Sequence, residues 1–436
     1  MNMGLSTLLD VGVPALLISL AVLLLMVHRE LGPFAGLKEG GKWLLMGAFG
    51  MGVLAFGIKL TVATAVAKMP ERTVGPLVAA YTRHEPADAG VPALPGAPPR
   101  LPEHYVWQAL PQTAPAPADN PTTPEKVALG KRLFFDPGLS ADGTVSCSSC
   151  HDLTGSAGAD GRRTALGIHG KTGSRNAPTV WNAAFQSVLF WDGRAASLEE
   201  QAKGPMLNPL EMGMPSAAVV EKRVAGNASY RGAFARAFGP DRPITLDHIA
   251  EAIAAYERTL ITPDSPYDRF VRGDRHALDT AQLRGMALFE SLGCVSCHKG
   301  ANFSDASLLG GQFPLRIFPS RPTPFDARYD LTADGGAAGR SGRGVWRVPS
   351  LRNVALTGPY FHNGSVDKLS DAVRVMANAQ LGVAMGASPG RTLYWSPEER
   401  VLSRTEPRAI GDREVEDIVA FLNGLSSDAL AKRDKN

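Results

Sequence analysis

The sequence contains only four cysteines among 436 residues, and all four belong to two copies of one short pattern, so none is left for any other role. It also has no alternating polar and apolar pattern of any length, which argues against a fold built on β-sheets. The formal net charge of +3 is too small to indicate a nucleic-acid partner. We therefore expect a mainly α-helical protein that binds no nucleic acid and whose cysteines share one chemistry.

The two cysteine patterns, residues 147–151 and 294–298, both read Cys-x-x-Cys-His. This is the attachment motif of haem c, in which two thiols bond the porphyrin vinyl groups and the adjacent histidine ligates the iron. A zinc site of four thiolates or a pair of redox disulfides would use the same cysteines, but neither explains the two histidines. The pattern predicts two covalent haems, held by Cys147, Cys150 and His151 and by Cys294, Cys297 and His298.

Two apolar segments near the N-terminus, about residues 11–27 and 43–67, approach the length needed to cross a bilayer. Three lysine and arginine residues lie between them, so we expect a two-span hairpin with its loop on the cytoplasmic side. Haem c is attached outside the bacterial cytoplasm, so residues 1–82 are expected to anchor a periplasmic protein to the inner membrane. The alternative is a signal peptide cleaved after residues 65–67, which would give a mature N-terminus near Lys68.

The rest of the chain divides into a spacer and two domains. Residues 83–123 are rich in proline and alanine, a composition that predicts a semi-stiff linker. Helical periodicity follows, and a proline-containing break at residues 262–266 marks a boundary. We therefore expect haem domains at 124–265 and 266–436. Within the second, residues 310–346 are rich in glycine, proline and arginine and predict a long loop.

The sequences of the two expected domains also resemble each other. Five positions of the first correspond to five positions of the second at a constant offset of 171 residues, a register that chance rarely keeps. The pairs are Pro178 and Pro349, Asn182 and Asn353, Trp191 and His362, Gly193 and Gly364, and Leu198 and Leu369. We interpret this register as an internal duplication of a cytochrome c-like helical domain.

Several longer strings resemble the bacterial dihaem cytochrome c peroxidases. They are residues 175–180 (RNAPTV), 190–194 (FWDGR), 210–213 (LEMG) and 348–364 (VPSLRNVALTGPYFHNG). The resemblance covers about residues 122–426, although residues 384–408 form a longer stretch than that family leads us to expect. It implies an enzyme that reduces hydrogen peroxide to water with electrons from a small periplasmic cytochrome c or cupredoxin.

The resemblance also implies different tasks for the two haems. The first is the low-potential peroxidatic centre, and the second is the high-potential centre that receives electrons. Met376 is the implied distal ligand of the second iron, although a methionine on a helix face more often packs a core. His169 is the implied displaceable ligand of the first iron, with a solvated loop histidine as the alternative.

Three further side chains have implied roles in the reaction. Glu211 is the acid–base residue, because peroxide must lose a proton from one oxygen and gain one on the other. The alternative for Glu211 is to stabilise the start of the next helix. Gln201 would help to position peroxide. Trp191 would carry electrons between the haems, or would pack as a buried aromatic residue.

The resemblance finally implies a calcium ion between the haems. Its ligands would be the side-chain oxygen of Asn176 and the backbone carbonyls of Thr357 and Pro359, with waters completing the shell. Such a set of hard oxygen ligands is the one that calcium prefers. Proteins of this family commonly form homodimers as well.

Two other functions are open at this point. One is a dihaem oxidase that matures a tryptophylquinone cofactor. Relatives with that activity carry tyrosine as the distal ligand of the second haem, so Met376 argues against it. The other is a non-enzymatic dihaem electron carrier with two permanently six-coordinate irons. His169 and Glu211, which have no counterpart in the second domain, argue against this second alternative.

Overall fold

The computed structural model describes residues 105–339, 344–381 and 410–433, which belong to one compact unit of the chain. Within these residues helices predominate, so the mainly α-helical prediction is confirmed. No helix in the described ranges is both long enough and apolar enough to cross a bilayer. The two segments expected to form a membrane hairpin, about 11–27 and 43–67, lie outside these ranges.

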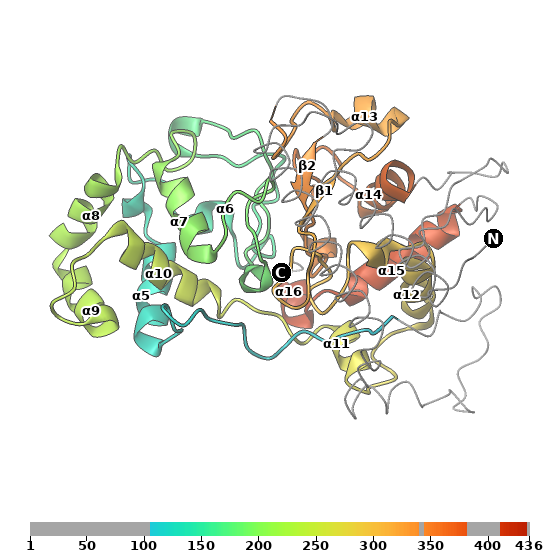
Figure 1. The fold of residues 1–436 in the computed structure, drawn as a ribbon, viewed down its shortest axis with the longest axis horizontal. Coiled ribbons are helices and arrows are strands. Elements are labelled where there is room, and N and C mark those ends of the chain that lie inside the picture. Colours follow the sequence, from blue (N-terminus) through green and yellow to red (C-terminus); the bar gives the residue numbers. More distant parts are fainter. Residues whose placement is uncertain (1–104, 340–343, 382–409, 434–436) are drawn as a thin grey trace, which may run out of the picture. The chain divides into compact units, whose positions relative to one another are not determined.

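Figure 1 shows two groups of helices, one from each half of the described chain. The first group contains α5 (Pro124–Phe134), α6 (Cys147–Cys150), α7 (Leu198–Leu207), α8 (Ala217–Gly226), α9 (Ala228–Phe238) and α10 (Leu246–Glu257). The second contains α11 (Pro266–Val271), α12 (Thr280–Ser291), α13 (Pro324–Tyr329), α14 (Leu369–Met376), α15 (Asp412–Gly424) and α16 (Asp428–Arg433). Shorter turns are η3 (Pro137–Leu139), η4 (Ile168–Gly170), η5 (Ala183–Phe185), η6 (Cys294–Ser296), η7 (Val354–Leu356) and the π-helical η8 (Ala377–Leu381).

The helix that precedes each cysteine motif starts at a strong capping signal. Helix α5 follows Thr123, whose side chain accepts a backbone hydrogen bond, and Pro124 occupies the first turn, where its missing N–H is not needed. Helix α12 follows Asp279, which exchanges hydrogen bonds with Gln282 in a capping box. These local signals fix where each helix begins and therefore where each motif follows it.

Each of these helices crosses a second helix of its own half at a glycine. A Cβ atom on Gly130 of α5 would lie 1.8 Å from the carbonyl oxygen of Ala252 in α10. A Cβ atom on Gly285 of α12 would lie 1.8 Å from the carbonyl oxygen of Asp417 in α15. Only glycine permits such an approach of two backbones. Each crossing lies in a separate apolar core, so the two halves are packed in the same way around different residues.

The loops of the two halves repeat one another as well. Asn182 and Asn353 adopt left-handed backbone conformations, with φ of 64° and 60°, and each starts a short 3-10 helix. Phe190 and Phe361 are also left-handed, with φ of 61° and 68°. Both pairs are separated by the 171 residues that relate the two sequences. The shared sequence register therefore corresponds to a shared backbone conformation.

Thr262 joins the two halves at the boundary that the proline-containing break indicated. Its hydroxyl accepts hydrogen bonds from the side-chain amides of Asn182 and Asn353, at 2.8 and 3.0 Å. The side-chain oxygen (Oδ1) of Asn182 accepts from the backbone N–H of Thr262, and Oδ1 of Asn353 accepts from the backbone N–H of Ser427, each at 2.9 Å. All four residues are buried, so corresponding turns of both halves share one polar junction.

Residues 105–123 do not behave as the spacer that their composition predicted. Leu110 is 1% exposed, and its backbone N–H donates to the carboxylate of Asp268 at 2.8 Å. Asn120 is 2% exposed and donates to Glu199 at 2.7 Å. This proline-rich segment has no core of its own. It is ordered because Leu110 and Asn120 are buried against the rest of the fold. The remainder of the predicted spacer lies outside the described residues.

The long loop expected within the second half is mostly irregular but holds some regular structure. It contains α13 and the short strand β1 (Leu315–Ile317). Strand β1 pairs antiparallel with β2 (Val345–Arg347), with Leu315 opposite Arg347. This pairing holds β2 in place, and the backbone N–H of Arg347 in β2 donates to the carbonyl oxygen of Trp191 in the first half. The stretch 384–408 lies outside the described residues.

Replacing Thr262 with valine should lower the free energy of unfolding by about 2–4 kcal/mol, because two buried amide groups lose their acceptor and each loss costs about 1–3 kcal/mol. Denaturation followed by circular dichroism measures the change. Thr280, exposed at the start of α12, provides the control, and its valine variant should differ from the parent by less than about 0.5 kcal/mol. Equal effects of the two substitutions would contradict a stabilising role for the shared hydroxyl.

Candidate functional site

One cavity of about 520 Å³ is lined by both Cys-x-x-Cys-His motifs. It also receives side chains from the loops and helices of both halves. The predicted site residues among its lining are Asn176, Trp191, Gln201, Glu211, Thr357, Pro359 and Met376. The structure therefore brings together every predicted site residue except His169.

The first motif forms the short helix α6, and its histidine follows directly. Nδ1 of His151 lies 3.1 Å from the carbonyl oxygen of Gly158, so this nitrogen donates and Nε2 keeps its lone pair for a metal. Burial lowers the pKa of His151, which favours the neutral ring that a metal needs. Burial also raises the pKa of Cys147 to about 12 and that of Cys150 to about 11.

The second motif repeats this arrangement. Nδ1 of His298 lies 3.2 Å from the carbonyl oxygen of Phe303, which again leaves Nε2 available. Burial lowers the pKa of His298 to about 4 and raises that of Cys294 to about 12. Both histidines are therefore neutral at physiological pH and are held by a backbone carbonyl. This is the geometry of a metal-ligating histidine in each half.

The remaining cavity lining fits two haem groups, whose carboxylates need cationic or hydrogen-bonding partners. Arg347 of β2 lines the cavity and is 6% exposed, and burial lowers its pKa to about 10, so it is still charged at neutral pH. Its Nε donates to the carbonyl oxygen of Phe190 at 2.9 Å. Nε2 of His362 is buried and has no partner among the described residues. A buried cation and an unpaired ring nitrogen both suit the carboxylates of a porphyrin.

Sequence reasoning had named no role for Arg347, yet the sequence repeat points to it. Arg347 follows Asn176 by 171 residues, the offset that relates Trp191 to His362. The structure shows the same relation in two hydrogen bonds that cross between the halves. The N–H of Asn176 donates to the carbonyl oxygen of His362 at 2.8 Å, and the N–H of Arg347 donates to that of Trp191 at 2.7 Å. The two halves therefore exchange equivalent contacts at the cavity.

Glu211 lies in the turn that follows α7 and lines the cavity. Its Oε1 accepts a hydrogen bond from the side-chain amide of Asn208 at 2.6 Å. Burial raises the pKa of Glu211, while the positive charge of Arg194 and the bond from Asn208 act in the opposite direction. A carboxyl group with a raised pKa in a cavity is suited to proton transfer. Gln201, on the preceding helix α7, lines the same cavity.

His169 lies on the surface in the turn η4, and its side chain is 62% exposed. Its Nδ1 lies 3.4 Å from a carboxylate oxygen of Asp142, and its φ of 55° is left-handed. The turn is held to the Glu211 segment, because the N–H of Ile168 donates to the carbonyl oxygen of Glu211 at 2.8 Å. His169 is thus next to the site but outside the cavity. Ligation of the first iron stays a prediction.

Met376 of the second half and Trp191 of the first half pack against one apolar cluster beside the cavity. Met376 is the last residue of α14, directly before the π-helical η8, and it packs against a small apolar cluster around Phe318 and Trp346. Trp191 packs against the same cluster, and its Nε1 donates to the carbonyl oxygen of Asn176 at 2.9 Å. Both side chains are partly buried and line the cavity. Their roles as a haem ligand and an electron carrier stay predictions.

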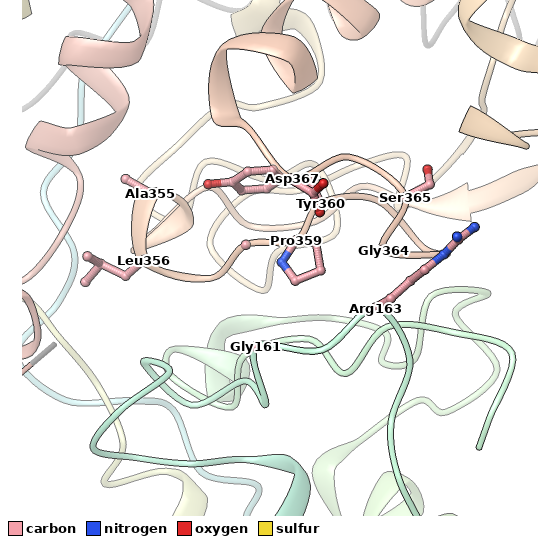
Figure 2. Close-up of a pocket in the computed structure, with 10 residues that line it drawn as sticks. Gly161, Arg163, Ala355, Leu356, Pro359, Tyr360, Gly364, Ser365 and Asp367 are labelled. Atoms are coloured by element: carbon pink, nitrogen blue, oxygen red, sulfur yellow. The ribbon is translucent and has the colours of Figure 1, made fainter. Parts of the chain in front are cut away.

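The three predicted calcium ligands, Asn176, Thr357 and Pro359, all line the cavity. The amide nitrogen of Asn176 donates to the carbonyl oxygen of Arg162 at 2.7 Å, which leaves its side-chain oxygen for another partner. Pro359 lines both the main cavity and a second pocket of about 640 Å³ (Figure 2). Figure 2 shows this pocket between Gly161 and Arg163 on one side and residues 355–367 on the other. In the described part of the chain no cluster of three or more His, Cys, Asp or Glu side chains could hold a metal ion. A calcium site here would thus use backbone and amide oxygens.

Comparison with proteins of known sequence gives consistent results. A family model described as di-haem cytochrome c peroxidase matches residues 124–276. The cytochrome c551 peroxidase of Pseudomonas aeruginosa is 39% identical over 329 residues, which are 74% of this chain and 84% of that protein. The methylamine utilization protein MauG of Methylorubrum extorquens is 35% identical over 327 residues, which are 74% of this chain and 84% of that protein.

Solved structures give the same likeness. A MauG-like protein associated with microbial copper homeostasis matches with a TM-score of 0.57 and 32% identity, over 76% of this chain and 99% of that one. The diheme peroxidase BthA from Burkholderia thailandensis matches with a TM-score of 0.53 and 28% identity, over 77% of this chain and 95% of that one. With two haem-attachment motifs that face one cavity, these findings show that the chain belongs to the dihaem cytochrome c peroxidase family.

Proposed function

We propose that the protein reduces hydrogen peroxide to water, with electrons from a small periplasmic cytochrome c or a cupredoxin. The observation that carries this proposal is the single cavity, which holds both haem-attachment motifs together with Glu211, Gln201 and Met376. An electron-transfer protein alone would need no acid with a raised pKa beside the first motif. The names of the peroxidase relatives support the same activity.

The two halves arose by duplication and then took different tasks. Residues 124–265 hold the low-potential peroxidatic haem, and residues 266–436 hold the high-potential haem that receives electrons. The repeated glycine crossings and left-handed asparagines support the duplication. The difference in task rests on side chains that only one half has: Glu211 and His169 in the first, and Met376 in the second.

Glu211 carries the proton in the reaction. The bound haem supplies the iron at which the oxygen–oxygen bond of peroxide is cleaved. The carboxylate of Glu211 accepts a proton from one peroxide oxygen and returns it to the other. The amide of Asn208 holds the carboxyl group in place through its 2.6 Å hydrogen bond. Gln201 lies on the same cavity wall and positions peroxide beside Glu211.

The second half delivers electrons to this chemistry. Met376 lines the cavity and would provide a thioether ligand at the second haem, a ligand that raises the reduction potential. Trp191 lies on the cavity lining between the segments of the two halves and is fixed by its bond to Asn176, so it is placed to carry electrons. Asn176, Thr357 and Pro359 would hold a calcium ion at this boundary. Arg347 and His362 would hold the carboxylates of the haems.

His169 controls access to the first iron. The turn that carries it contains adjacent glycines, which supply the conformational freedom for a change of position. Its surface position beside Asp142 suits the state in which the iron is open to peroxide. With the haem bound and oxidised, His169 would be the residue that closes the first iron to substrate.

The protein acts in the periplasm, anchored to the inner membrane by its N-terminal segment, and forms a homodimer. The attachment of haem c outside the cytoplasm supports the location. A second candidate activity is the maturation of a tryptophylquinone cofactor, which the MauG relatives bring into consideration. Met376, in place of tyrosine, favours the peroxidase.

Replacing Glu211 with glutamine should lower kcat by about 10²–10⁴, because glutamine cannot accept a proton. In the parent protein the rate should rise with pH through the pKa of Glu211, which burial places above the ordinary carboxyl range. This limb of the pH profile should disappear in the variant. Glu200, exposed on α7, provides the control, and its glutamine variant should keep full turnover. Normal turnover of the Glu211→Gln variant would remove Glu211 from the mechanism.

Replacing His169 with glycine should give an enzyme that turns over peroxide without prior reduction, because no side chain is left to close the first iron. The measurement is the peroxide reduction rate of the purified protein, fully oxidised and half-reduced, together with its visible spectrum. The matched control is His276→Gly, a substitution of another exposed histidine, which should leave the requirement for reduction unchanged. If the His169→Gly variant still needed reduction, the proposed control of access would be wrong.

A further inference from the structure

The two halves present different side chains to the cavity at one equivalent position. The glycine crossings align α10 with α15, because Ala252 and Asp417 take the same place opposite Gly130 and Gly285. This alignment has an offset of 165 residues. It pairs Ile253 with Ile418 and Glu257 with Leu422, and all four of these residues line the cavity. The first half therefore has a carboxyl group where the second half has a leucine.

Glu257 is buried without a counter-charge of its own. It is 5% exposed, and its Oε2 has no hydrogen-bond partner among the described residues. The neighbouring Arg258 pairs with Glu199 of α7 instead. Burial raises the pKa of Glu257 to about 8, while the charge of Arg258 opposes this increase and that of Glu199 adds to it. The other titratable groups that interact with it are Tyr256 and the thiol of Cys147 in α6.

The charge of the first haem should act strongly on this carboxyl group. The interaction with Cys147 places Glu257 within electrostatic range of the atom that would bond the porphyrin. A ferric haem carries one positive charge more than a ferrous haem. In a buried site with low dielectric, the loss of that charge makes the carboxylate less stable and the neutral acid more stable. Leu422 gives the second haem no such group.

We propose that Glu257 is the redox-linked proton site of the first haem: when one electron from the donor reduces the iron from ferric to ferrous, the carboxylate of Glu257 takes up one proton from solvent. This inference rests on the proposed presence of a redox-active haem on Cys147, Cys150 and His151. It makes the potential of the first haem fall as pH rises, while the potential of the second haem stays constant. The potential gap between the haems therefore widens in alkaline conditions.

The test is a spectroelectrochemical titration of both haems in the full-length holoprotein between about pH 6 and pH 9. In the parent protein the reduction equilibrium of the first haem should change by up to about tenfold per pH unit, or about 59 mV. Replacing Glu257 with glutamine, or with the leucine of the second half, should remove this dependence and leave the second haem unchanged. The glutamine and leucine variants differ in chemistry, so if one of them fails to fold, the other still tests the pH dependence.

Glu290 of α12 provides the matched control. It is 6% exposed, burial raises its pKa to about 7, and it is not part of the cavity lining. The Glu290→Gln variant should keep the pH dependence of the parent. An unchanged slope in the Glu257 variants, or a parent protein without any slope, would overturn the assignment. A protein that shows fewer than two haem signals would instead contradict the proposed function itself, so the two failures are distinguishable.

Discussion

The hydroxyl of Thr262 accepts hydrogen bonds from Asn182 and Asn353, and these two asparagines start equivalent turns in the two halves. Each turn leads into a loop that forms cavity wall: the first reaches Trp191, and the second reaches Pro359 and His362. Because all three polar groups are buried, each needs the others to remain satisfied. This junction of three side chains therefore links the equivalent turns of the two halves from which the cavity loops begin.

Much of this arrangement could be predicted from the sequence because its signals are local. Attachment of haem c needs two thiols and a histidine within five residues, so residues 147–151 and 294–298 can be recognised as attachment motifs from the sequence alone. The constant offset of 171 residues indicated that Asn182 and Asn353 occupy equivalent positions, and the structure gives both the same left-handed backbone conformation. Helix starts at Thr123 and Asp279 likewise follow from adjacent side chains.

What the sequence did not reveal depends on contacts between distant segments. Residues 105–123 have the composition of a linker, and only the surface beneath Leu110 and Asn120 makes them part of the fold. Glu257 and Leu422 were not recognised as equivalents because α10 and α15 align at an offset of 165, not 171. The surface position of His169 depends on Asp142 and on a bond to the backbone of Glu211, and neither contact has a sequence signature.

The reciprocal bonds from Asn176 to His362 and from Arg347 to Trp191 have a consequence for how the two halves move. Each half thereby contributes one backbone bond to the cavity loop of the other half. Because the two bonds are reciprocal, a displacement of one loop would strain the bond that holds the corresponding loop of the other half.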